Sequence, residues 1–493
     1  MNVFDYLLEG KPPSAIALLT LQGECTYGTL RAAAQKVTSH LIARGGKKGD
    51  RALLLADSGE FWVAAYLGIL RAGLVCVPLP SRIPAEDLEY IYCVTEPAFL
   101  FVEARHQSRI PEALHQLSTI TNEQIDPDGN DFPEARLCKT APDDLAALMF
   151  TSGSTGKPRG VMISHGNIIA NADSIIEYLS LTAHDRIMAV LPFHYCFGTS
   201  LLHTHLRVGG SIVVDHRFMY PEKILQRMHE TSCTGFAGVP SHFQILLRKS
   251  NFARTIFPHL RYLQQAGGPL APNFIRELRE ALPDKQIFVM YGQTEATARL
   301  SYLPPHLLAA KLGSVGKGIP GVTLSVLNEA GAAVGLGETG EIVAEGANVA
   351  LGYWHDDEET VRCFRDGKLY TGDLATVDED GFIFIVDRAK DFLKCGGKRV
   401  SCRQLENVLL EHQELLEAAV VGVPDDILGE AAIAYVVPRD RTQQPSAEQL
   451  NVYCRQRLPL PFVPKRFVIL KSLPKNSSGK VLKPLLKTQA VAL

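Results

Sequence analysis

Short apolar runs alternate with stretches of helical period along roughly the first 380 residues of the chain. Residues 59–72 and 273–282 have a helical period, and the apolar positions of the first of these helices lie on one broad face. This alternation predicts an α/β fold in which helices cover the faces of sheets. Three apolar runs have the length of buried strands, at residues 51–56, 74–79 and 98–102.

The pattern changes near residues 387–398, where charged residues are dense and paired glycines follow. Beyond this segment, the sequence predicts a second, smaller α+β domain of about one hundred residues, which is an ordinary domain size. We therefore place a domain boundary between residues 388 and 389. The expected elements of the small domain are helices over 403–417 and 447–458 and strands over 418–423 and 431–437.

Composition limits the class of protein. The chain has 493 residues, of which 46% are hydrophobic, so two or more packed domains are expected. The formal net charge is −3 and no Lys/Arg-rich block occurs, which favours neither nucleic acid nor an anionic membrane as a partner. No apolar run of about 18 residues is present, and the N-terminus lacks a secretory pattern, so we expect no membrane span.

The cysteines point to a reducing compartment. Ten of them are scattered from Cys25 to Cys454 without a CxxC pair or a Cys/His cluster at zinc spacing. This usage fits reduced thiols in a cytoplasmic protein and argues against structural zinc.

A loop rich in glycine and hydroxyl groups, TSGSTGKPRG at 151–160, follows the apolar run 145–150. A buried strand that ends in such a loop can place backbone amides and hydroxyls around phosphate oxygens. The loop is not the phosphate loop of Walker-type ATPases, which has a Ser or Thr after the lysine, because Pro158 follows Lys157 here. Taken alone, the loop is equally compatible with a surface turn.

Four further motifs follow in order: YGQTEAT at 291–297, YTGD at 370–373, DRAKD at 387–391 and KNSSGK at 475–480. Together with the loop at 151–160 they resemble the adenylate-forming superfamily, which contains acyl-CoA and aryl-CoA ligases, adenylation domains and beetle luciferases. The resemblance implies that a carboxylate attacks the α-phosphate of ATP, releases pyrophosphate, and leaves an acyl-adenylate that a thiol intercepts. It also implies a large multi-sheet N-terminal domain, 1–388, and a small mobile C-terminal lid domain, 389–493.

The resemblance assigns residues to ATP. Tyr291 is placed against the adenine face, where an aromatic ring stacks without base-specific contacts. Asp373 accepts hydrogen bonds from both ribose hydroxyls, and Arg388 approaches the ribose or the phosphates. Asp387 precedes Arg388, where many members have glycine. The pyrophosphate is expected on the loop residues Thr151, Ser152, Gly153, Ser154, Thr155, Gly156 and Lys157.

The same motifs supply the catalytic residues. Glu295 is the candidate ligand for Mg²⁺, a hard cation that prefers carboxylate and phosphate oxygens. Thr294 is expected near the α-phosphate, and Lys480 is expected to bridge the substrate carboxylate and the α-phosphate. Lys390 falls at the hinge about which the small domain rotates between the two half-reactions. Each side chain has an ordinary alternative: an exposed surface group for Glu295 and Lys480, and a solvated linker residue for Lys390.

The acyl and thiol sites are also implied by resemblance. In the segment at 191–200, His194 lies where amino-acid adenylation domains carry an aspartate, which argues against an α-amino acid substrate. Gly267 and Gly268 are expected in the acyl pocket, together with residues 237–243 and those after Glu295. Gly396 and Gly397 are expected to line the pantetheine channel.

Arg299 lies just beyond Glu295 and has two interpretations. Its guanidinium could bind a second carboxylate or another polar group of the substrate, or it could form a structural ion pair at the edge of the pocket.

The leading hypothesis is a Mg²⁺- and ATP-dependent ligase that joins a non-amino carboxylic acid to coenzyme A. Its nearest rival loads the phosphopantetheine arm of a separate carrier protein, which offers the same thiol. A luciferase-type oxygenase and a noncatalytic nucleotide-binding protein are the other classes considered. Light emission or oxygen uptake would identify the former. The joint presence of Glu295, Asp373, Arg388 and Lys480 argues against the latter.

Overall fold

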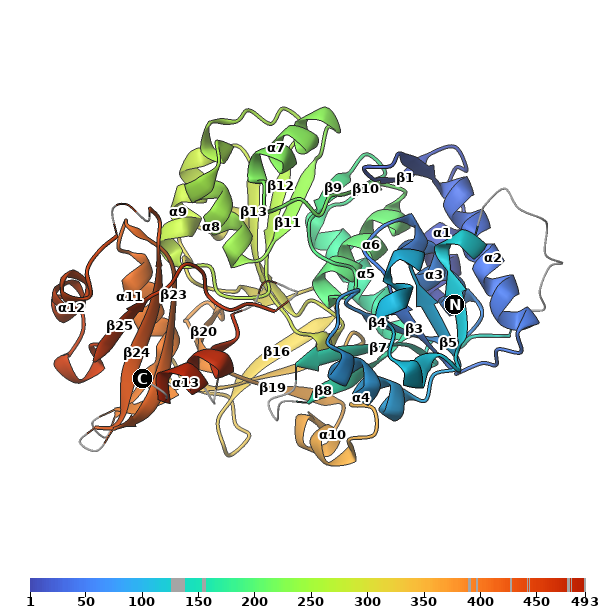
Figure 1. The fold of residues 1–493 in the computed structure, drawn as a ribbon. Coiled ribbons are helices and arrows are strands. Elements are labelled where there is room, and N and C mark those ends of the chain that lie inside the picture. Colours follow the sequence, from blue (N-terminus) through green and yellow to red (C-terminus); the bar gives the residue numbers. More distant parts are fainter. Residues whose placement is uncertain are drawn as a thin grey trace.

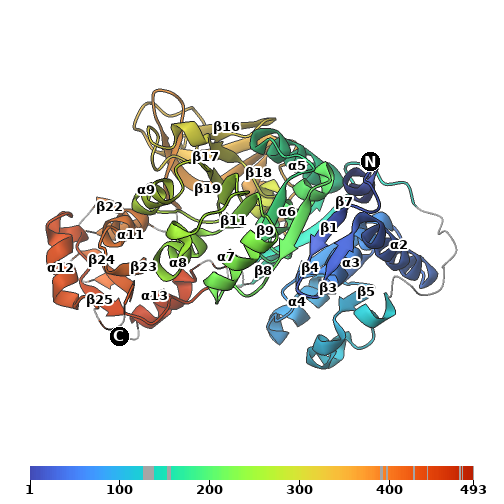
Figure 2. The ribbon, with the colours of Figure 1, turned by 90° about the horizontal axis from the view of Figure 1, so that it is seen from above.

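The computed structural model divides into a large N-terminal part with three sheets and a smaller C-terminal part with one sheet (Figure 1). The C-terminal part lies at the opposite end of the molecule from α2 in both ribbon views (Figure 2). The structure describes residues 1–125, 138–152, 157–388, 392–395, 398–425, 428–440, 442, 444–476, 479 and 481–491.

The first sheet contains the strand that leads into the phosphate loop. Its six strands run in the order β6-β5-β3-β4-β7-β8, and all pairs are parallel except β7 with β8. The three strands predicted at 51–56, 74–79 and 98–102 are all present. The members are β3 (Arg51–Leu55), β4 (Val75–Leu79), β5 (Phe99–Val102), β6 (Ser118–Thr121), β7 (Leu145–Ser152) and β8 (Pro158–Ser164).

The second sheet has nine strands in the order β15-β14-β13-β12-β11-β9-β10-β1-β2. Its central strands from β13 to β1 are parallel, so their carboxyl ends meet at one edge, where Tyr291 ends β13. The members are β1 (Ile16–Leu19), β2 (Glu24–Thr26), β9 (Arg186–Ala189), β10 (Ser211–Val214), β11 (Gly235–Gly238), β12 (Tyr262–Gln265), β13 (Gln286–Tyr291), β14 (Ser301–Leu303) and β15 (Lys317–Gly318).

A layer of helices separates these two sheets, and one continuous core joins it to both. The layer consists of α1 (Val3–Leu8), α2 (Tyr27–Ala43), α3 (Glu60–Arg71), α5 (His165–Leu179) and α6 (Cys196–Val208). Residues 62–70 of α3 are all buried. The apolar surface of this helix is therefore wider than the one face predicted for 59–72. The helix is buried on every side within the helix layer and does not lie on a single sheet.

Other helices cover the outer faces of the two sheets. On the first sheet this is α4 (Ala85–Thr95), which shares a core cluster with β3, β4 and β5. On the second sheet they are α7 (Pro221–Glu230), α8 (Pro240–Lys249) and α9 (Pro272–Ala281). The helix predicted at 273–282 is thus confirmed as α9. No described helix has both the length and the apolar run that crossing a membrane requires.

A third sheet packs beside the end of β13. It contains β16 (Val322–Leu327), β17 (Gly340–Gly346), β18 (Phe364–Arg365), β19 (Lys368–Val377) and β20 (Ile383–Arg388), with α10 (Asp357–Cys363) just before β18. Ala344 and Leu369 of this sheet share a small core with Tyr291, Ala296 and Leu300. The antiparallel register of β19 and β20 sets Asp373 opposite Arg388.

The C-terminal sheet follows and has helices on both faces. Its strands are β21 (Phe392–Cys395), β22 (Lys398–Ser401), β23 (Leu415–Asp425), β24 (Gly429–Pro438) and β25 (Arg466–Ile469). Alternate residues of β24 face two separate cores: Ala432, Ala434 and Val436 face one, and Ile433, Tyr435 and Val437 face the other. The helices are α11 (Cys402–Leu410) and α12 (Ala447–Arg455) on the first core and α13 (Lys483–Val491) on the second.

One predicted element of this part was too long. The helix expected over 403–417 ends at Leu410, and Leu415 already begins β23. The apolar residues near the end of that pattern belong to a buried strand, which periodicity over so short a run does not distinguish from a helix. The domain boundary that we propose after residue 388 falls between the end of β20 and the start of β21.

Candidate active site

Three of the predicted ATP-binding residues come together between the second and third sheets. The Tyr291 hydroxyl donates a hydrogen bond to Asp373 Oδ2 at 2.6 Å. Arg388 Nε lies 3.1 Å from the other carboxylate oxygen, Oδ1. Asp373 is buried, whereas the side chain of Arg388 is 61% exposed. Residues nearly one hundred positions apart in the sequence therefore form one cluster with a hydrogen-bonded aromatic ring.

Burial raises the pKa of Tyr291 well above its usual range, and the charge and hydrogen bond of Asp373 raise it further. The phenol therefore stays protonated and remains a donor to the carboxylate at neutral pH. A fixed aromatic ring beside a carboxylate offers a stacking surface and a hydrogen-bond acceptor side by side.

Glu295 lies on the 3₁₀ turn Thr294–Ala296 that follows β13. Its Oε1 accepts a hydrogen bond from the hydroxyl of Tyr353 at 2.9 Å, and its backbone oxygen accepts from Ala350 N. No Lys or Arg pairs with this carboxylate in the described ranges. This carboxylate and the neighbouring Thr294 hydroxyl supply oxygen ligands of the kind that a hard cation prefers.

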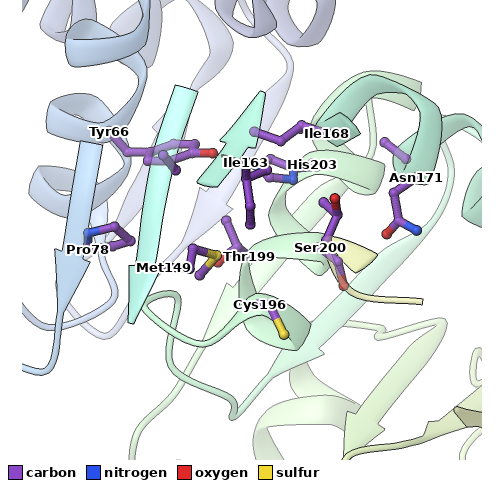
Figure 3. Close-up of a pocket in the computed structure, with 13 residues that line it drawn as sticks. Tyr66, Pro78, Met149, Ile163, Ile168, Asn171, Cys196, Thr199, Ser200 and His203 are labelled. Carbon is purple, nitrogen blue, oxygen red and sulfur yellow. Dashed lines mark hydrogen bonds between the residues drawn. The ribbon is translucent and has the colours of Figure 1, made fainter. Parts of the chain in front are cut away.

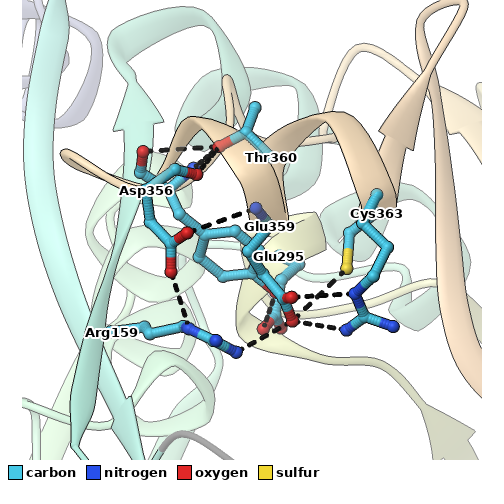
Figure 4. Close-up of polar contacts among 8 residues, drawn as sticks. Arg159, Glu295, Asp356, Glu359, Thr360 and Cys363 are labelled. Atoms are coloured by element: carbon cyan, nitrogen blue, oxygen red, sulfur yellow. Dashed lines mark hydrogen bonds and ion pairs between the residues drawn. The ribbon is translucent and has the colours of Figure 1, made fainter.

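An ion-pair network joins β8 to the start of α10 (Figure 4). Arg159 of β8 donates from Nε to Asp356 at 2.9 Å and from Nη1 to Glu359 at 2.8 Å. Its guanidinium carbon also lies 5.9 Å from the ring centroid of Tyr353. Asp356 in turn caps the first turn of α10 by accepting from Glu359 N. Arg159 thereby ties the strand after the loop to the ring that holds Glu295.

The phosphate loop connects β7 and β8, whose ladder continues to the pair Ser152 and Pro158. The predicted strand at 145–150 is thus confirmed as part of β7. Thr151 also lies in β7, opposite Arg159. Lys157 is exposed, and its ammonium nitrogen lies 5.3 Å from the ring centroid of Tyr90. Eight predicted residues lie outside the described residues: Gly153, Ser154, Thr155, Gly156, Lys390, Gly396, Gly397 and Lys480.

The start of α6 connects the turn of Glu295 to the segments predicted for the acyl group. Thr294 Oγ1 contacts Cys196 Sγ at 3.4 Å, which links the turn of Glu295 to the first residue of α6. A Cβ on Gly198 would lie 2.1 Å from the Pro192 oxygen, so the first turn of α6 presses closely against the segment that carries His194. Burial lowers the pKa of His194 to about 4, with the charge of Asp57 opposing the shift. The imidazole is therefore neutral at pH 7.

The two glycines after β12 lie on the same side. Gly267 has φ +84°, and a Cβ there would be 2.8 Å from the Tyr195 hydroxyl and 2.9 Å from Val239. Gly268 accepts a hydrogen bond from Gln265 Nε2 at 2.8 Å. Only glycine at position 267 lets the backbone approach Tyr195 this closely. The segments predicted for the acyl side therefore lie close together.

Arg299 is 1% exposed and does not form the ion pair proposed as one of its two interpretations. No Asp or Glu pairs with it in the part of the chain that the structure describes. Its guanidinium carbon instead lies 3.9 Å from the ring centroid of Phe197. Neither Phe197, which lies within the segment 191–200, nor Tyr353 was predicted from the sequence, because both reach the site through tertiary packing.

A small cavity lies behind this region, between α5, α6 and the first sheet (Figure 3). Cys196, Thr199, Ser200 and His203 of α6 face Met149 and Ile163 across it. Its volume is about 10 Å³, close to what one water molecule needs. It is too small to hold a carboxylic acid and is a packing gap beside the site.

The C-terminal part contacts the acyl-side wall. A Cβ on Gly479 would lie 3.1 Å from Val239, so the residue before Lys480 packs against the start of α8. Near the proposed hinge, Asp387 accepts hydrogen bonds from Ser401 Oγ at 2.7 Å and from Arg403 N at 3.2 Å. These contacts hold the small domain in the orientation seen here.

Two protein-family profiles match the chain. The profile described as "AMP-binding enzyme" matches residues 8–354. The chain belongs to the AMP-binding enzyme family. The profile of the AMP-binding enzyme C-terminal domain matches residues 404–480 of the same chain. The resemblance to adenylate-forming enzymes is therefore confirmed over both parts of this AMP-binding enzyme.

AMP-binding enzymes with assigned names resemble this one over nearly the whole chain. Feruloyl-CoA synthase of Amycolatopsis sp is 30% identical over 461 residues, 93% of this chain and 92% of that protein. 2-Succinylbenzoate–CoA ligase of Bacillus subtilis is 29% identical over 476 residues, 96% of this chain and 95% of that protein.

Solved structures of the family share the fold. o-Succinylbenzoate CoA synthetase (MenE) from Bacillus subtilis, in complex with the acyl-adenylate intermediate, has a TM-score of 0.89 at 28% identity, covering 99% of this chain and 98% of that one. The anthranilate CoA ligase AuaEII, in complex with anthranoyl-AMP, has a TM-score of 0.91 at 26% identity, covering 100% and 98%. This AMP-binding enzyme is an AMP-forming acid–thiol ligase with a large N-terminal and a small C-terminal domain.

Proposed function

We propose that this AMP-binding enzyme activates a non-amino carboxylic acid with ATP and Mg²⁺ and passes the acyl group to coenzyme A. The observation that carries the proposal is the continuity of the site. Tyr291, Asp373 and Arg388 form a nucleotide cluster, Glu295 lies on the next turn, and Thr294 touches the first residue of α6. Nucleotide, metal and acyl sites would thus follow one another where the carboxyl end of β13 meets the third sheet and the start of α6.

The nucleotide cluster would hold adenosine. Tyr291 offers its ring to the adenine, and its hydroxyl keeps the Asp373 carboxylate in place. Asp373 would accept hydrogen bonds from the ribose hydroxyls, and the exposed Arg388 would reach the ribose or the phosphates. Thr151, Ser152 and Lys157, with Gly153, Ser154, Thr155 and Gly156, would surround the pyrophosphate.

Glu295 and Thr294 would hold the metal and the α-phosphate. Held by these oxygens, Mg²⁺ would supply positive charge against the phosphates. Tyr353 keeps the Glu295 carboxylate oriented by its hydrogen bond. Lys480 would bridge the substrate carboxylate and the α-phosphate, so that two negatively charged groups can meet.

The two steps balance in atoms and charge. A carboxylate oxygen forms a bond to the α-phosphorus while the bond from that phosphorus to the pyrophosphate oxygen breaks. The thiol then attacks the acyl carbon, its proton passes to solvent, and AMP leaves with the former carboxylate oxygen. Rotation about Lys390 would bring Gly396 and Gly397 to the thiol channel. His194, neutral at pH 7, would contribute hydrogen bonding rather than charge to the acyl side.

The absence of an acidic side chain at position 194 supports a substrate without an α-ammonium group, because a buried ammonium needs a paired anion. The relatives are named for different acids, so their names do not choose one for this chain. A cytoplasmic location stays a prediction.

The test is carboxylate-dependent release of pyrophosphate with ATP and Mg²⁺, measured across short, long, aromatic, dicarboxylic and amino acids with and without coenzyme A. The proposal expects release with selected non-amino acids and formation of the corresponding acyl-CoA. Acid-dependent release without an acyl-CoA would instead favour a carrier protein as acceptor. Release with amino acids alone would overturn the assignment of the acid class.

A further inference from the structure

Arg299 is a buried cation without a buried anion. Its residue exposure is 1%, and no Asp or Glu of the described ranges forms an ion pair with it. A guanidinium removed from water is stabilised best by a carboxylate or phosphate that accepts two of its N–H groups. The face of an aromatic ring, here that of Phe197, supplies only part of that stabilisation.

Among the described residues the polar contacts of the guanidinium are with neutral groups, and they include a hydrogen bond with the side chain of Tyr178. Nε lies 3.4 Å from the thioether sulfur of Met290, and Nη2 lies 3.4 Å from Gln264 Oε1. A thioether is a poor acceptor, and 3.4 Å is long for a hydrogen bond to an oxygen. Arginine carries more N–H donors than these three contacts use.

Gln264 provides a second, independent sign of a missing acceptor. It is 1% exposed, and among the described residues its Nε2 has no acceptor within hydrogen-bond distance; the side chain of Tyr262 is the polar group beside it. A buried amide donor left without an acceptor is costly, and native structures contain few of them. Arg299 and Gln264 therefore place unused donors side by side at the end of β12.

The backbone of Arg299 is fixed from several sides. Its carbonyl oxygen accepts hydrogen bonds from Asn171 Nδ2 at 3.0 Å and from Asn348 Nδ2 at 2.8 Å. Thr297, two residues earlier, has φ +66°, which is unusual for a β-branched residue and marks a locally strained turn. The turn between Glu295 and Arg299 is thus held in one shape.

These donors lie on the acyl side of the reaction centre. Thr294 touches Cys196, and the next residue, Phe197, carries the guanidinium on its ring. Gln264 lies on β12, two residues before the Ala266–Gly268 turn, whose Gly267 contacts Tyr195. Arg299 is therefore close in the fold to both the catalytic turn and the glycine turn.

From this arrangement we infer that Arg299 and Gln264 bind a second carboxylate, at the end of the substrate away from the reacting carboxylate. The inference rests on the proposed function and names its substrate class: a dicarboxylic acid. One carboxylate is adenylated beside Thr294, and the other accepts N–H groups from the guanidinium and the amide. Arg299 is a specificity-determining residue in this assignment.

The experiment compares each dicarboxylic acid with its own monomethyl ester, which keeps the length and removes the second charge. Acid-dependent pyrophosphate release is measured with wild type and with Arg299→Met. Wild type should prefer the diacid by about 100-fold or more in kcat/KM, because an unpaired buried donor set rejects the neutral analogue. In Arg299→Met this preference should vanish, mainly through a higher KM for the diacid.

Three further variants keep the test decisive. Arg299→Lys retains the charge without the forked donors and should keep part of the preference. Gln264→Leu should weaken diacid use several-fold while sparing the half-ester. Arg261→Met removes an arginine that pairs with Asp185 away from the site, and should leave the preference unchanged. If Arg299→Met does not fold, Arg299→Lys and Gln264→Leu still report on the preference.

Two outcomes would overturn the inference. In the first, wild type has the same kcat/KM for monoacids and for diacids of the same length. In the second, the Arg299 and Gln264 variants lose the same fraction of activity with every acid. Either result would leave Arg299 as a packing residue while the ligase function stood. Failure of every carboxylic acid to drive pyrophosphate release would instead refute the proposed function itself.

Discussion

The nucleotide side of the site and its acyl side meet at the turn of Glu295, yet their charges are arranged differently. On the nucleotide side, Asp373 is matched by Arg388 and by the hydroxyl of Tyr291. On the acyl side, Arg299 is buried against Phe197, and no described acidic residue pairs with it; the neighbouring Gln264 Nε2 has no acceptor in the described residues. The first cluster is internally balanced, and the second has an excess of donors.

The difference indicates where substrate choice is encoded. A balanced cluster is stable without a ligand and can serve any acid, since every acid is activated by the same ATP. An excess of buried donors is stabilised only when a ligand supplies the missing acceptor. Variants on the nucleotide side should therefore affect all acids alike, and variants on the acyl side should discriminate between acids.

The largest effect is expected for Lys480→Ala. This change should lower acyl-adenylate formation by about 1,000-fold, because the lysine would neutralise charge between carboxylate and α-phosphate. Transfer from a supplied acyl-adenylate to coenzyme A should change only a few-fold. Lys475→Ala is the matched control in the same segment, since Lys475 pairs with Glu417. Equal losses in both half-reactions would show that Lys480 does not have this role.

Asp373→Ala should raise the KM for ATP by about 100-fold, since the ribose acceptor and the partner of Tyr291 are lost together. The loss should be the same for every acid, which contrasts directly with Arg299→Met. Asp378→Asn changes a carboxylate in the same hairpin that pairs with Lys311 and is the control. A change in acid preference on Asp373→Ala would break the separation of the two sides.

Tyr353→Phe should raise the Mg²⁺ concentration for half-maximal activity by about tenfold, because Glu295 loses the hydrogen bond that orients it. Glu295→Gln, which removes the charge itself, should raise it further. Titration of activity with Mg²⁺ at saturating ATP measures both. Tyr453→Phe, in the C-terminal part, is the control. An unchanged Mg²⁺ requirement in Glu295→Gln would exclude Glu295 as the Mg²⁺ ligand.

The smallest effect is expected when low pH destabilises the fold through two buried histidines of α6. Burial lowers the pKa of His203 to about 3 and that of His205 to about 4. The unfolded chain therefore binds more protons than the folded one below about pH 6.5, so the free energy of unfolding falls as pH decreases towards 4. At pH 5.5 the loss should be on the order of 1 kcal/mol for each histidine.

Urea unfolding followed by circular dichroism between pH 7.5 and 5 measures this slope. His205→Gln should flatten it while preserving a hydrogen-bond partner for the Tyr262 hydroxyl, which lies 2.9 Å from His205 Nε2. A slope that does not change would mean that His205 titrates alike in the folded and unfolded chain.

Much of the nucleotide side could be read from the sequence because its residues lie in contiguous motifs. Tyr291 and Glu295 belong to one short segment, and Asp373 and Arg388 lie on the two strands of one hairpin, so local structure sets most of their geometry. The main strands and helices were also predictable, since period and apolar runs follow from burial. The range predicted for the helix at 403–417 was too long. Its last residues are apolar because they begin the buried strand β23.

The acyl side could not be read in the same way. Arg299 was visible as a charged residue past the catalytic turn, but an exposed ion pair and a buried substrate-binding group have the same local sequence. Phe197, Gln264 and Met290 lie on α6, β12 and β13, and only the packing of the helix layer on the second sheet brings them to one guanidinium. The sequence by itself determined the reaction class, because that chemistry depends on residues a few positions apart. The tertiary structure alone decided that the cation at 299 is buried without an acidic partner among the described residues, because burial and pairing depend on elements that meet only in the folded chain.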